Sequence, residues 1–329
     1  MLKMTWTGFA LGLALVSGCS QSSFINDEEI ADQWQSSLVD NGTQLNGVRM
    51  NGVRMNGVRM NGTSLEGTPE DTSITVSGAD LNSATMEGET ESGDGVSLKV
   101  DQVFWSPTAS RYLYNVKYYD EDGNWQWLCG EDTFGNPIAA MPLMKAWYLN
   151  TGNEWEDLTR FSLSCVNAAL GKCDLWGYKL GNVNRNESYN SEIRSRDLAV
   201  LHQTCQRLVR ADYCGNGTPH TRNGTSVDVY DAYGIQTPDN LGTQSLEADW
   251  RPDGAHCIRH SRWTTADSTV TGGQSDIDYV QATCPSRLAS SPSAIYDCND
   301  ETKSSFYPEN GFTLSQSQRL VIRNRSSAN

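Results

Sequence analysis

The chain has 329 residues, with 40 acidic side chains against 25 basic ones and a formal net charge of −15 at pH 7. The imbalance is greatest in residues 20–95, which hold 13 acids and 3 arginines. No basic stripe is left by this distribution, so the sequence argues against a nucleic acid partner. Residues 96–329 are long enough to form one large domain with its own core.

The first 18 residues have the features of a bacterial lipoprotein signal peptide. Lys3 supplies a positive start, and residues 8–16 form an apolar run too short to span a bilayer. The following Ser-Gly-Cys resembles a lipobox, so we expect Cys19 to carry a lipid that anchors the protein in a membrane. The alternative is ordinary cleavage with Cys19 incidental. By analogy with enterobacterial sorting, the serine after Cys19 favours the outer over the inner membrane of the bacterial cell envelope.

Residues 19–42 are polar and acidic and are predicted to be a tether. The pentamer NGVRM then occurs three times in residues 46–60. An apolar residue recurs every five positions, at Leu45, Met50, Met55, Met60 and Leu65. This spacing resembles the pentapeptide-repeat solenoid. Two interpretations of residues 43–90 remain open: a short coil stacked on the following domain, or a flexible spacer with periodic Asn-Gly turns.

A β-hairpin is predicted for residues 111–129. Alternating apolar and polar residues in 111–119 are followed by the turn DEDGN and by a second strand at 125–129. Residues 120, 122 and 124 also have the spacing that opens a calcium loop, but the glutamate needed at its twelfth position fits only loosely, so the hairpin is favoured. Further strands are expected at 142–149, 226–236, 256–263 and 319–323, with a turn at 250–254.

One principal helix is predicted at about residues 191–214. Its apolar stripe recurs at three- and four-residue steps and consists of Leu198, Leu201, Cys205 and Leu208. Gly215 and Gly217 are expected to end the helix. The predicted fold class is therefore α+β, with mostly antiparallel strands packed around this helix.

Eight cysteines remain after Cys19, and an even number in an exported chain predicts up to four disulfides. None of the eight cysteines has the Cys-x-x-Cys spacing that is typical of a redox centre or a zinc ribbon. A helix would hold Cys205 and Cys214 about 13 Å apart, too far for a bridge, so both are expected to have distant partners. The candidates are Cys129, Cys165, Cys173, Cys205, Cys214, Cys257, Cys284 and Cys298.

A polar cluster around the helix end is the candidate functional site. It consists of His202, Arg210, Asp212, His220, Arg222 and Asp228. Three interpretations remain open. The first is a structural ion-pair network of Arg210, Asp212 and Arg222. The second is a zinc site of His202, His220, Cys205 and Cys214, and the third is a hydrolase in which one of these cysteines is the nucleophile, one of these histidines the base, and Asp212 or Asp228 the orienting acid. No complete catalytic motif favours an enzyme, and the sequence predicts no metal or cofactor. Five tryptophans were considered as the lining of a sugar- or peptide-binding groove, against the alternative of core packing: Trp125, Trp127, Trp147, Trp155 and Trp176.

The segment Ala211-Asp212-Tyr213-Cys214 resembles the signature of the ADYC domain, a family of bacterial secreted proteins. The stretches at 127–130, 171–178, 202–225 and 253–259 fit the same pattern. The resemblance extends from about residue 104 to residue 298, and we assign an ADYC-type domain to residues 96–310, followed by a C-terminal strand and polar tail at 311–329. It implies no activity. The predicted protein is thus an exported, lipid-anchored binding or structural module, with a protein or a glycan as the expected kind of ligand.

Overall fold

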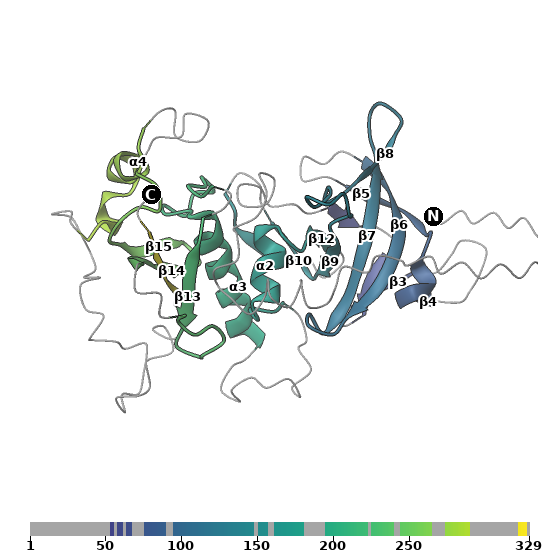
Figure 1. The fold of residues 1–329 in the computed structure, drawn as a ribbon, viewed down its shortest axis with the longest axis horizontal. Helices are drawn as coiled ribbons and strands as arrows, with labels where there is room; N and C mark the ends of the chain where they lie inside the picture. The colour runs from purple at the N-terminus through teal and green to yellow at the C-terminus, as the bar shows by residue number, and fades with distance from the viewer. Residues whose placement is uncertain are drawn as a thin grey trace, which may run out of the picture.

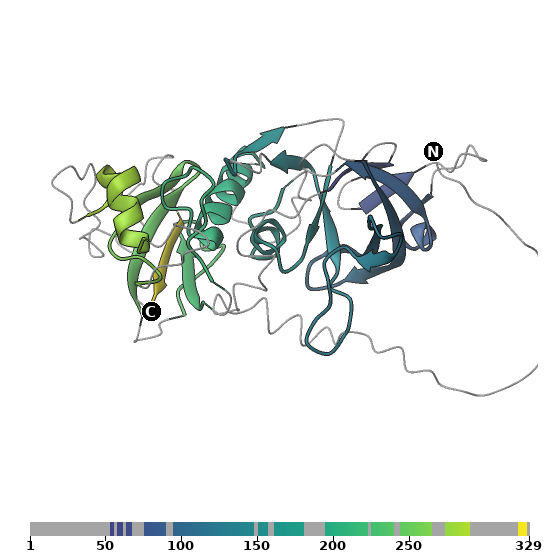
Figure 2. The same cartoon turned by 90° about the horizontal axis from the view of Figure 1, so that it is seen from above.

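The computed structural model describes residues 53–55, 58–61, 64–67, 76–89, 95–147, 151–156, 161–180, 195–222, 225–239, 244–264, 274–289 and 322–327. Two groups of strands lie on either side of a pair of helices (Figure 1). These helices are α2 (Ala169–Leu175) and α3 (Ser195–Arg210), and the view from above shows the same order (Figure 2). A third helix, α4 (Asp276–Thr283), lies at the outer end of the second group.

Most strands of the first group form a closed antiparallel barrel. The strands are β1 (Val53–Met55), β5 (Thr85–Glu89), β6 (Gly95–Ser106), β7 (Arg111–Tyr119), β8 (Trp125–Trp127), β9 (Ala140–Leu143) and β12 (Ser162–Cys165). Their order is β6-β5-β1-β12-β9-β7-β8, and β6 also pairs with β7, so the sheet closes on itself while β8 extends it as a hairpin arm. Closure leaves no long free edge for pairing with another chain.

The barrel core follows from the two-residue period of its strands. Leu98 and Val100 on β6 and Tyr114 and Val116 on β7 are buried at alternate positions. Tyr114 is the polar member of this core, and its hydroxyl accepts a hydrogen bond of 2.9 Å from the Leu65 N–H. Burial raises the pKa of Tyr114 to about 12, so this hydroxyl stays protonated.

The NGVRM copies in the described residues are antiparallel strands. Val53–Met55 is β1, which pairs with β12 on one side and with β5 on the other. β2 (Val58–Asn61) pairs with β3 (Ser64–Gly67), which pairs with β4 (Val76–Ser77), followed by the 3-10 turn at Gly78–Leu81. Neither a solenoid coil nor a flexible spacer describes these copies, because a five-residue period also fits a short strand plus a turn. The predicted signal peptide, the tether and the first copy lie outside the described residues.

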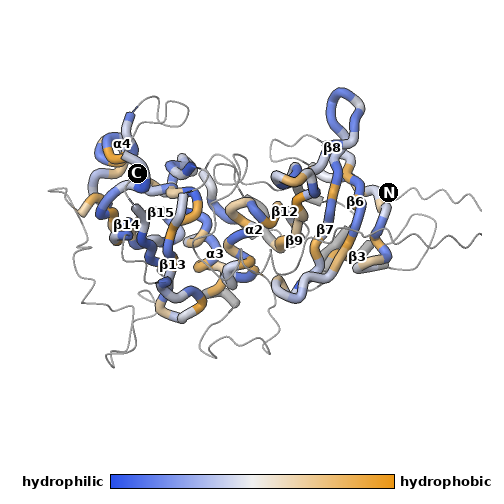
Figure 3. The backbone as a smooth tube through the Cα atoms, in the orientation of Figure 1, coloured by the Kyte–Doolittle hydropathy of each residue, from blue (hydrophilic) through white to orange (hydrophobic). Residues whose placement is uncertain are grey.

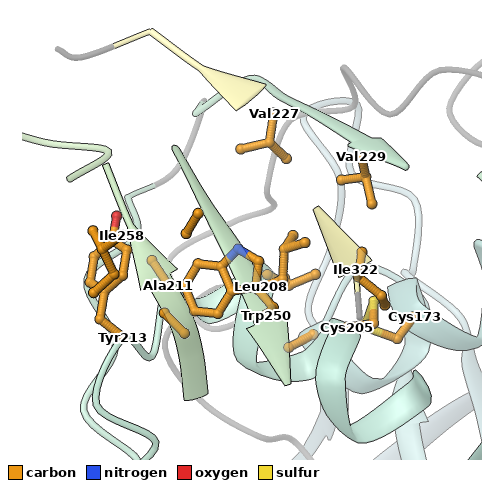
Figure 4. Close-up of a cluster of buried hydrophobic side chains, with 14 of the residues drawn as sticks. Cys173, Cys205, Leu208, Ala211, Tyr213, Val227, Val229, Trp250, Ile258 and Ile322 are labelled. Atoms are coloured by element: carbon orange, nitrogen blue, oxygen red, sulfur yellow. A yellow bond between two sulfur atoms is a disulfide. The ribbon is translucent and has the colours of Figure 1, made fainter. Parts of the chain in front are cut away.

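The second group of strands forms a four-stranded antiparallel sheet in the order β13-β16-β14-β15. The strands are β13 (Val227–Asp231), β14 (Ser245–Arg251), β15 (Gly254–Ile258) and β16 (Ile322–Ser326). Helix α3 packs on this sheet, and the shared core includes Leu208, Val229 and Trp250 (Figure 4). The 3-10 turn at Pro285–Arg287 follows α4. A separate antiparallel pair consists of β10 (Lys145–Trp147) and β11 (Glu154–Glu156). The turn between these strands contacts α3, because the Gly152 carbonyl accepts a hydrogen bond from the Gln203 side-chain amide.

The predicted hairpin is confirmed, since β7 pairs with β8 in antiparallel register. The expected strands near 142, 227, 256 and 322 also exist, with shifted bounds. Helices α2 and α4 were not predicted, so α3 is one of three α-helices in the described part of the chain. Among the described residues, these strands and helices carry apolar stretches interspersed with polar ones (Figure 3).

Helix α3 ends four residues earlier than predicted. Its stripe is buried as expected, but the helix stops at Arg210 because Ala211 adopts the left-handed conformation, with φ of 51°. The Ala211 N–H bonds to the Leu208 carbonyl at 2.9 Å, and the Asp212 N–H bonds to the Arg207 carbonyl at 2.9 Å. This pair of bonds is a Schellman cap, which usually places glycine where Ala211 stands. The predicted start at residues 191–194 lies outside the described residues.

Candidate functional site

The six residues predicted as one polar cluster bind separate partners. Exposure is 3% or less for His202, Arg210, Asp212, His220 and Asp228. Arg222 stacks over the Trp263 ring, with its guanidinium carbon 4.4 Å from the ring centre. The carboxylate of Asp228 accepts the Asp239 N–H at 3.0 Å. Five of the six are nearly fully buried, and Asp212 forms its ion pair with Arg207 rather than with another member of the predicted cluster, so the six residues do not form one solvent-accessible site.

His202 links α3 to α2 and β11. Its Nδ1 lies 2.7 Å from a Glu154 carboxylate oxygen, and its Nε2 lies 3.1 Å from the Leu170 carbonyl oxygen. A carbonyl oxygen only accepts hydrogen bonds, so the Nε2 contact requires Nε2 to be the donor. Both ring nitrogens are thereby occupied in holding secondary structure together.

The cysteine chemistry considered from the sequence is corrected by the disulfides. Cys205 is bonded to Cys173, which joins α3 to α2, and Cys214 is bonded to Cys284 at the end of α4. Their sulfurs are therefore neither zinc ligands nor thiolate nucleophiles in this structure. The expectation of distant partners for both is confirmed. Cys165 on β12 is bonded to Cys129, which lies just after β8.

His220 fastens α4 to the segment that follows α3. Its Nδ1 lies 3.0 Å from an Asp276 carboxylate oxygen, and its ring packs 4.7 Å from that of Tyr279. The Tyr279 hydroxyl donates to Thr218 at 3.1 Å and accepts from the Asn216 amide at 3.0 Å. These non-covalent contacts hold α4 to the segment after α3, as the disulfide between Cys214 and Cys284 also does.

Asp212 organises the turn after α3. It forms a buried ion pair with Arg207 and accepts backbone N–H bonds from Asn216 at 3.1 Å and from Gly217 at 2.9 Å. The Arg207 guanidinium also donates to the carbonyl of Thr151 at 2.7 Å and to that of Pro252 at 3.0 Å. The buried pair of Arg207 and Asp212 thus joins three loops that are distant in sequence. Its two charges therefore have a structural role.

Tyr213 is fully buried in the core shared by α3 and the four-stranded sheet. Its ring stacks on Trp250 with centroids 5.3 Å apart, and its carbonyl accepts the Ala255 N–H at 2.9 Å. Its hydroxyl donates to Glu247 at 3.1 Å and accepts from the Arg262 N–H at 2.7 Å. Burial, followed by the charge of Glu247, raises the pKa of Tyr213 well above its ordinary value, so the hydroxyl remains a donor.

All five N–H groups of the fully buried Arg262 guanidinium have acceptors. Two bonds of 3.1 and 3.0 Å go to the two carboxylate oxygens of Glu247, in the bidentate geometry typical of strong arginine pairs. The others go to the Leu208 and Val209 carbonyls at 3.0 and 3.3 Å and to the Thr221 hydroxyl at 3.0 Å. The two carbonyls belong to the last turn of α3, where a positive charge also complements the helix dipole.

Glu247 completes this network from β14. Besides Arg262 and Tyr213 it accepts the Asn324 side-chain amide at 2.7 Å, and the Asn324 oxygen accepts the Trp250 indole N–H at 2.7 Å. Burial would raise the pKa of Glu247, but the charge and hydrogen bonds of Arg262 outweigh it, and the pKa is lowered. A carboxylate that stays ionised and whose oxygens are occupied inside the protein holds a fold together and does not exchange protons with a substrate.

Glu247, Arg262 and Asn324 are not among the site residues predicted from the sequence. The available signal was β14 itself: Ser245–Arg251 alternates acids with apolar residues, yet both of its faces are buried. Buried acids need cationic partners, which Arg262 and Arg323 provide. Arg323 reaches Asp249 with a bond of 2.9 Å. Single-strand periodicity could not tell a doubly covered strand from one that faces water.

The five tryptophans considered as a groove lining do not share one environment. Trp176 is buried in the core beside α2, whereas Trp125 on β8 is 40% exposed. Trp127 is half-buried beneath the ammonium group of Lys117, which lies 4.0 Å from its ring centre. The side chains of Trp147 and Trp155 lie outside the described part of the structure.

At residues 211–214 of this disulfide-stabilised domain, a helix stop, a buried ion pair, a core tyrosine and a cystine follow one another directly. The model of the ADYC domain matches residues 78–264, which is more than half of the chain. The protein belongs to the ADYC domain family. No curated protein and no solved structure matches the chain.

Proposed function

We propose that this ADYC domain protein is an exported, lipid-anchored protein of the bacterial cell envelope that serves as a binding or structural module. The observation that carries the proposal is the state of the cysteines. Cys129, Cys165, Cys173, Cys205, Cys214, Cys257 and Cys284 are all disulfide-bonded, which is every cysteine among the described residues. Disulfides on this scale are typical of compartments outside the cytoplasm.

The anchor belongs to the same proposal. The described helices include none that is both long and apolar enough to cross a bilayer. Cys19, at the lipobox-like site, is the attachment point we propose, in the outer membrane by preference. A module of this kind needs a stable scaffold more than a reactive centre. The internally satisfied network around Tyr213, Arg262 and Glu247 supports that reading over the alternative of an exported hydrolase or metal enzyme built on His202 and His220.

Replacing Cys19 with alanine is expected to abolish lipid attachment and to release the protein from membranes. The test is metabolic labelling with a fatty acid, together with fractionation of the producing bacterium. A matched Ser20→Ala variant should keep the label, because the acylated thiol is untouched. Retention of the Cys19→Ala protein in membranes through an unprocessed signal peptide would be recognised by its higher mass, whereas a labelled Cys19→Ala protein would rule out this anchor.

The fourth disulfide gives an independent check of the anchor. Cys257 is disulfide-bonded to a partner outside the described residues, and Cys19 and Cys298 are the two cysteines that remain. A lipid on the Cys19 sulfur excludes it from a disulfide, so we expect peptide mapping of the oxidised protein to find Cys257 joined to Cys298. A peptide that joins Cys257 to Cys19 would refute acylation at Cys19.

A further inference from the structure

The outer face of the β7–β8 hairpin carries an aromatic strip, which we define as Tyr119, Trp125, Trp127 and Lys117. The strand register pairs Tyr119 with Trp125 and Lys117 with Trp127 across the hairpin. The two pairs are two residues apart, so their side chains lie on the same face, about 7 Å from one another along the strands. Tyr119 is 48% exposed and Trp125 is 40% exposed, which is unusual for rings of this size.

The geometry of the strip leaves its outer rings open. Tyr119 and Trp125 have ring centroids 5.2 Å apart and planes tilted by 60°, so the rings do not stack flat on each other, and each stays partly exposed. Beside them the Lys117 ammonium covers Trp127 and forms an ion pair of 3.2 Å with Asp101 on β6. The surface therefore presents two partly exposed aromatic rings followed by a neutralised pair of hydrogen-bonding groups.

The hairpin holds these rings in place before any ligand arrives. The Asp120 carboxylate accepts the Asn124 N–H at 2.7 Å and the Gln126 side-chain amide at 3.0 Å, which fixes the turn. These bonds, that of the Asn124 N–H first, also lower the pKa of Asp120, because they favour its ionised form. Cys129, two residues after β8, is tied to Cys165 on β12. A surface that is already ordered loses less conformational entropy on binding.

We propose that the aromatic strip binds a polysaccharide chain built of pyranose rings. A pyranose has a C–H face that is attracted to the negative face of an aromatic ring, and hydroxyl or N-acetyl groups at its edge that hydrogen-bond to side chains such as Lys117 and Asp101. The strip offers these two features side by side. The proposal rests on the proposed binding role and names the class of ligand for it.

Two other occupants fit the strip less well. The acids at 120–122 form the tip of the turn, which projects beyond the barrel (Figure 1) and is hydrophilic (Figure 3), so an anionic lipid surface is repelled. The two open rings are bordered by charged groups and are far smaller than the roughly 800 Å² that each partner contributes to a stable protein interface. A polysaccharide, which binds to small aromatic platforms with polar borders, is the occupant that the surface favours.

The test is titration of the purified full-length protein with chitohexaose and with cellohexaose, followed by tryptophan fluorescence and by calorimetry. We expect saturable binding of at least one of them, and a loss of affinity of at least about tenfold in Trp125→Ala. Trp105→Ala is the matched control: Trp105 is 50% exposed and packs edge-on against Tyr112, at the opposite end of β7. Its affinity should be unchanged.

Several results would overturn the proposal. They are equal affinity in Trp125→Ala and the wild type, absence of binding of both sugars at millimolar concentration, and a strip whose substitution changes only vesicle binding or self-association. Thermal unfolding of each variant checks that the fold is intact, since both tryptophans are exposed and their loss should leave Tm nearly unchanged. Acylation of Cys19 is measured separately, so failure to bind sugar does not bear on export or anchoring.

Discussion

Replacing Arg262 with methionine is expected to lower the free energy of unfolding by about 3–5 kcal/mol, because it leaves the buried carboxylate of Glu247 without its countercharge. Methionine has a similar length and no N–H groups. The substitution therefore removes the bidentate pair and also the guanidinium N–H bonds to the Leu208 and Val209 carbonyls in the last turn of α3. The measurement is denaturant unfolding of the oxidised protein at neutral pH.

The surface pair of Lys117 and Asp101 provides the control. Their N···O distance is 3.2 Å, close to that of the buried pair, but their side chains are 26% and 40% exposed. Exposed pairs contribute about 0–1 kcal/mol, so Asp101→Asn should change stability by less than that. If Arg262→Met costs no more than Asp101→Asn, the network is not the structural centre that its geometry indicates.

Glu247 gives the same network a pH signature. Its pKa is lowered in the folded protein, so the unfolded chain binds a proton at higher pH than the folded one does. The stabilisation is therefore present above about pH 4.5 and is lost as the pH falls through the lower pKa of the folded state. In Glu247→Gln this part of the acid dependence should disappear, which denaturant unfolding across that window would show as a smaller loss of stability on acidification.

Part of the fold could be predicted from the sequence because some sequence patterns depend only on neighbouring residues. The β7–β8 hairpin was predicted from alternation and a turn-forming DEDGN, and the stripe of α3 from its three- and four-residue spacing. The barrel was not predicted, since β1 pairs with β12 more than 100 residues later and a strand of three residues carries almost no pattern of its own. The five-residue NGVRM period suggested a coil or a spacer for the same reason, because it carries no information on the strands with which β1 and β2 pair.

The end of α3 shows why local rules failed at the candidate site. Gly215 was expected to be the helix stop, but the left-handed residue is the fully buried Ala211, whose strain of about 1–2 kcal/mol is offset by the two cap bonds and by packing. The partners that decide the site, Glu247 and Arg262, lie 34 or more residues beyond Tyr213. No pattern in the sequence close to Tyr213 indicates that Glu247 and Arg262 are its partners. Residues that depend on tertiary pairing are the ones single-sequence reasoning misses.

Gly215 has a different task, and Gly215→Ala is expected to cost about 4 kcal/mol or more and to reduce the yield of folded protein. A Cβ at this position would lie 1.7 Å from the Asp253 carbonyl oxygen. The approach is mutual, since a Cβ on Gly254 would lie 2.6 Å from the Gly215 nitrogen and 2.8 Å from the Tyr213 carbonyl oxygen. Here the turn after Cys214 and the turn between β14 and β15 pack backbone against backbone, and neither can move without breaking the bond between the Ala255 N–H and the Tyr213 carbonyl.

Gly234→Ala separates this close approach from backbone strain. Gly234 has φ of 70° and Gly215 has φ of 69°, but a Cβ on Gly234 meets nothing within 4 Å. Its substitution should therefore cost only the left-handed strain of about 1–2 kcal/mol. Denaturant unfolding of both variants, with disulfide mapping to confirm native pairing, measures the difference. Equal losses would mean that strain alone accounts for Gly215, and the two turns would not then be the rigid contact on which the Tyr213 corner rests.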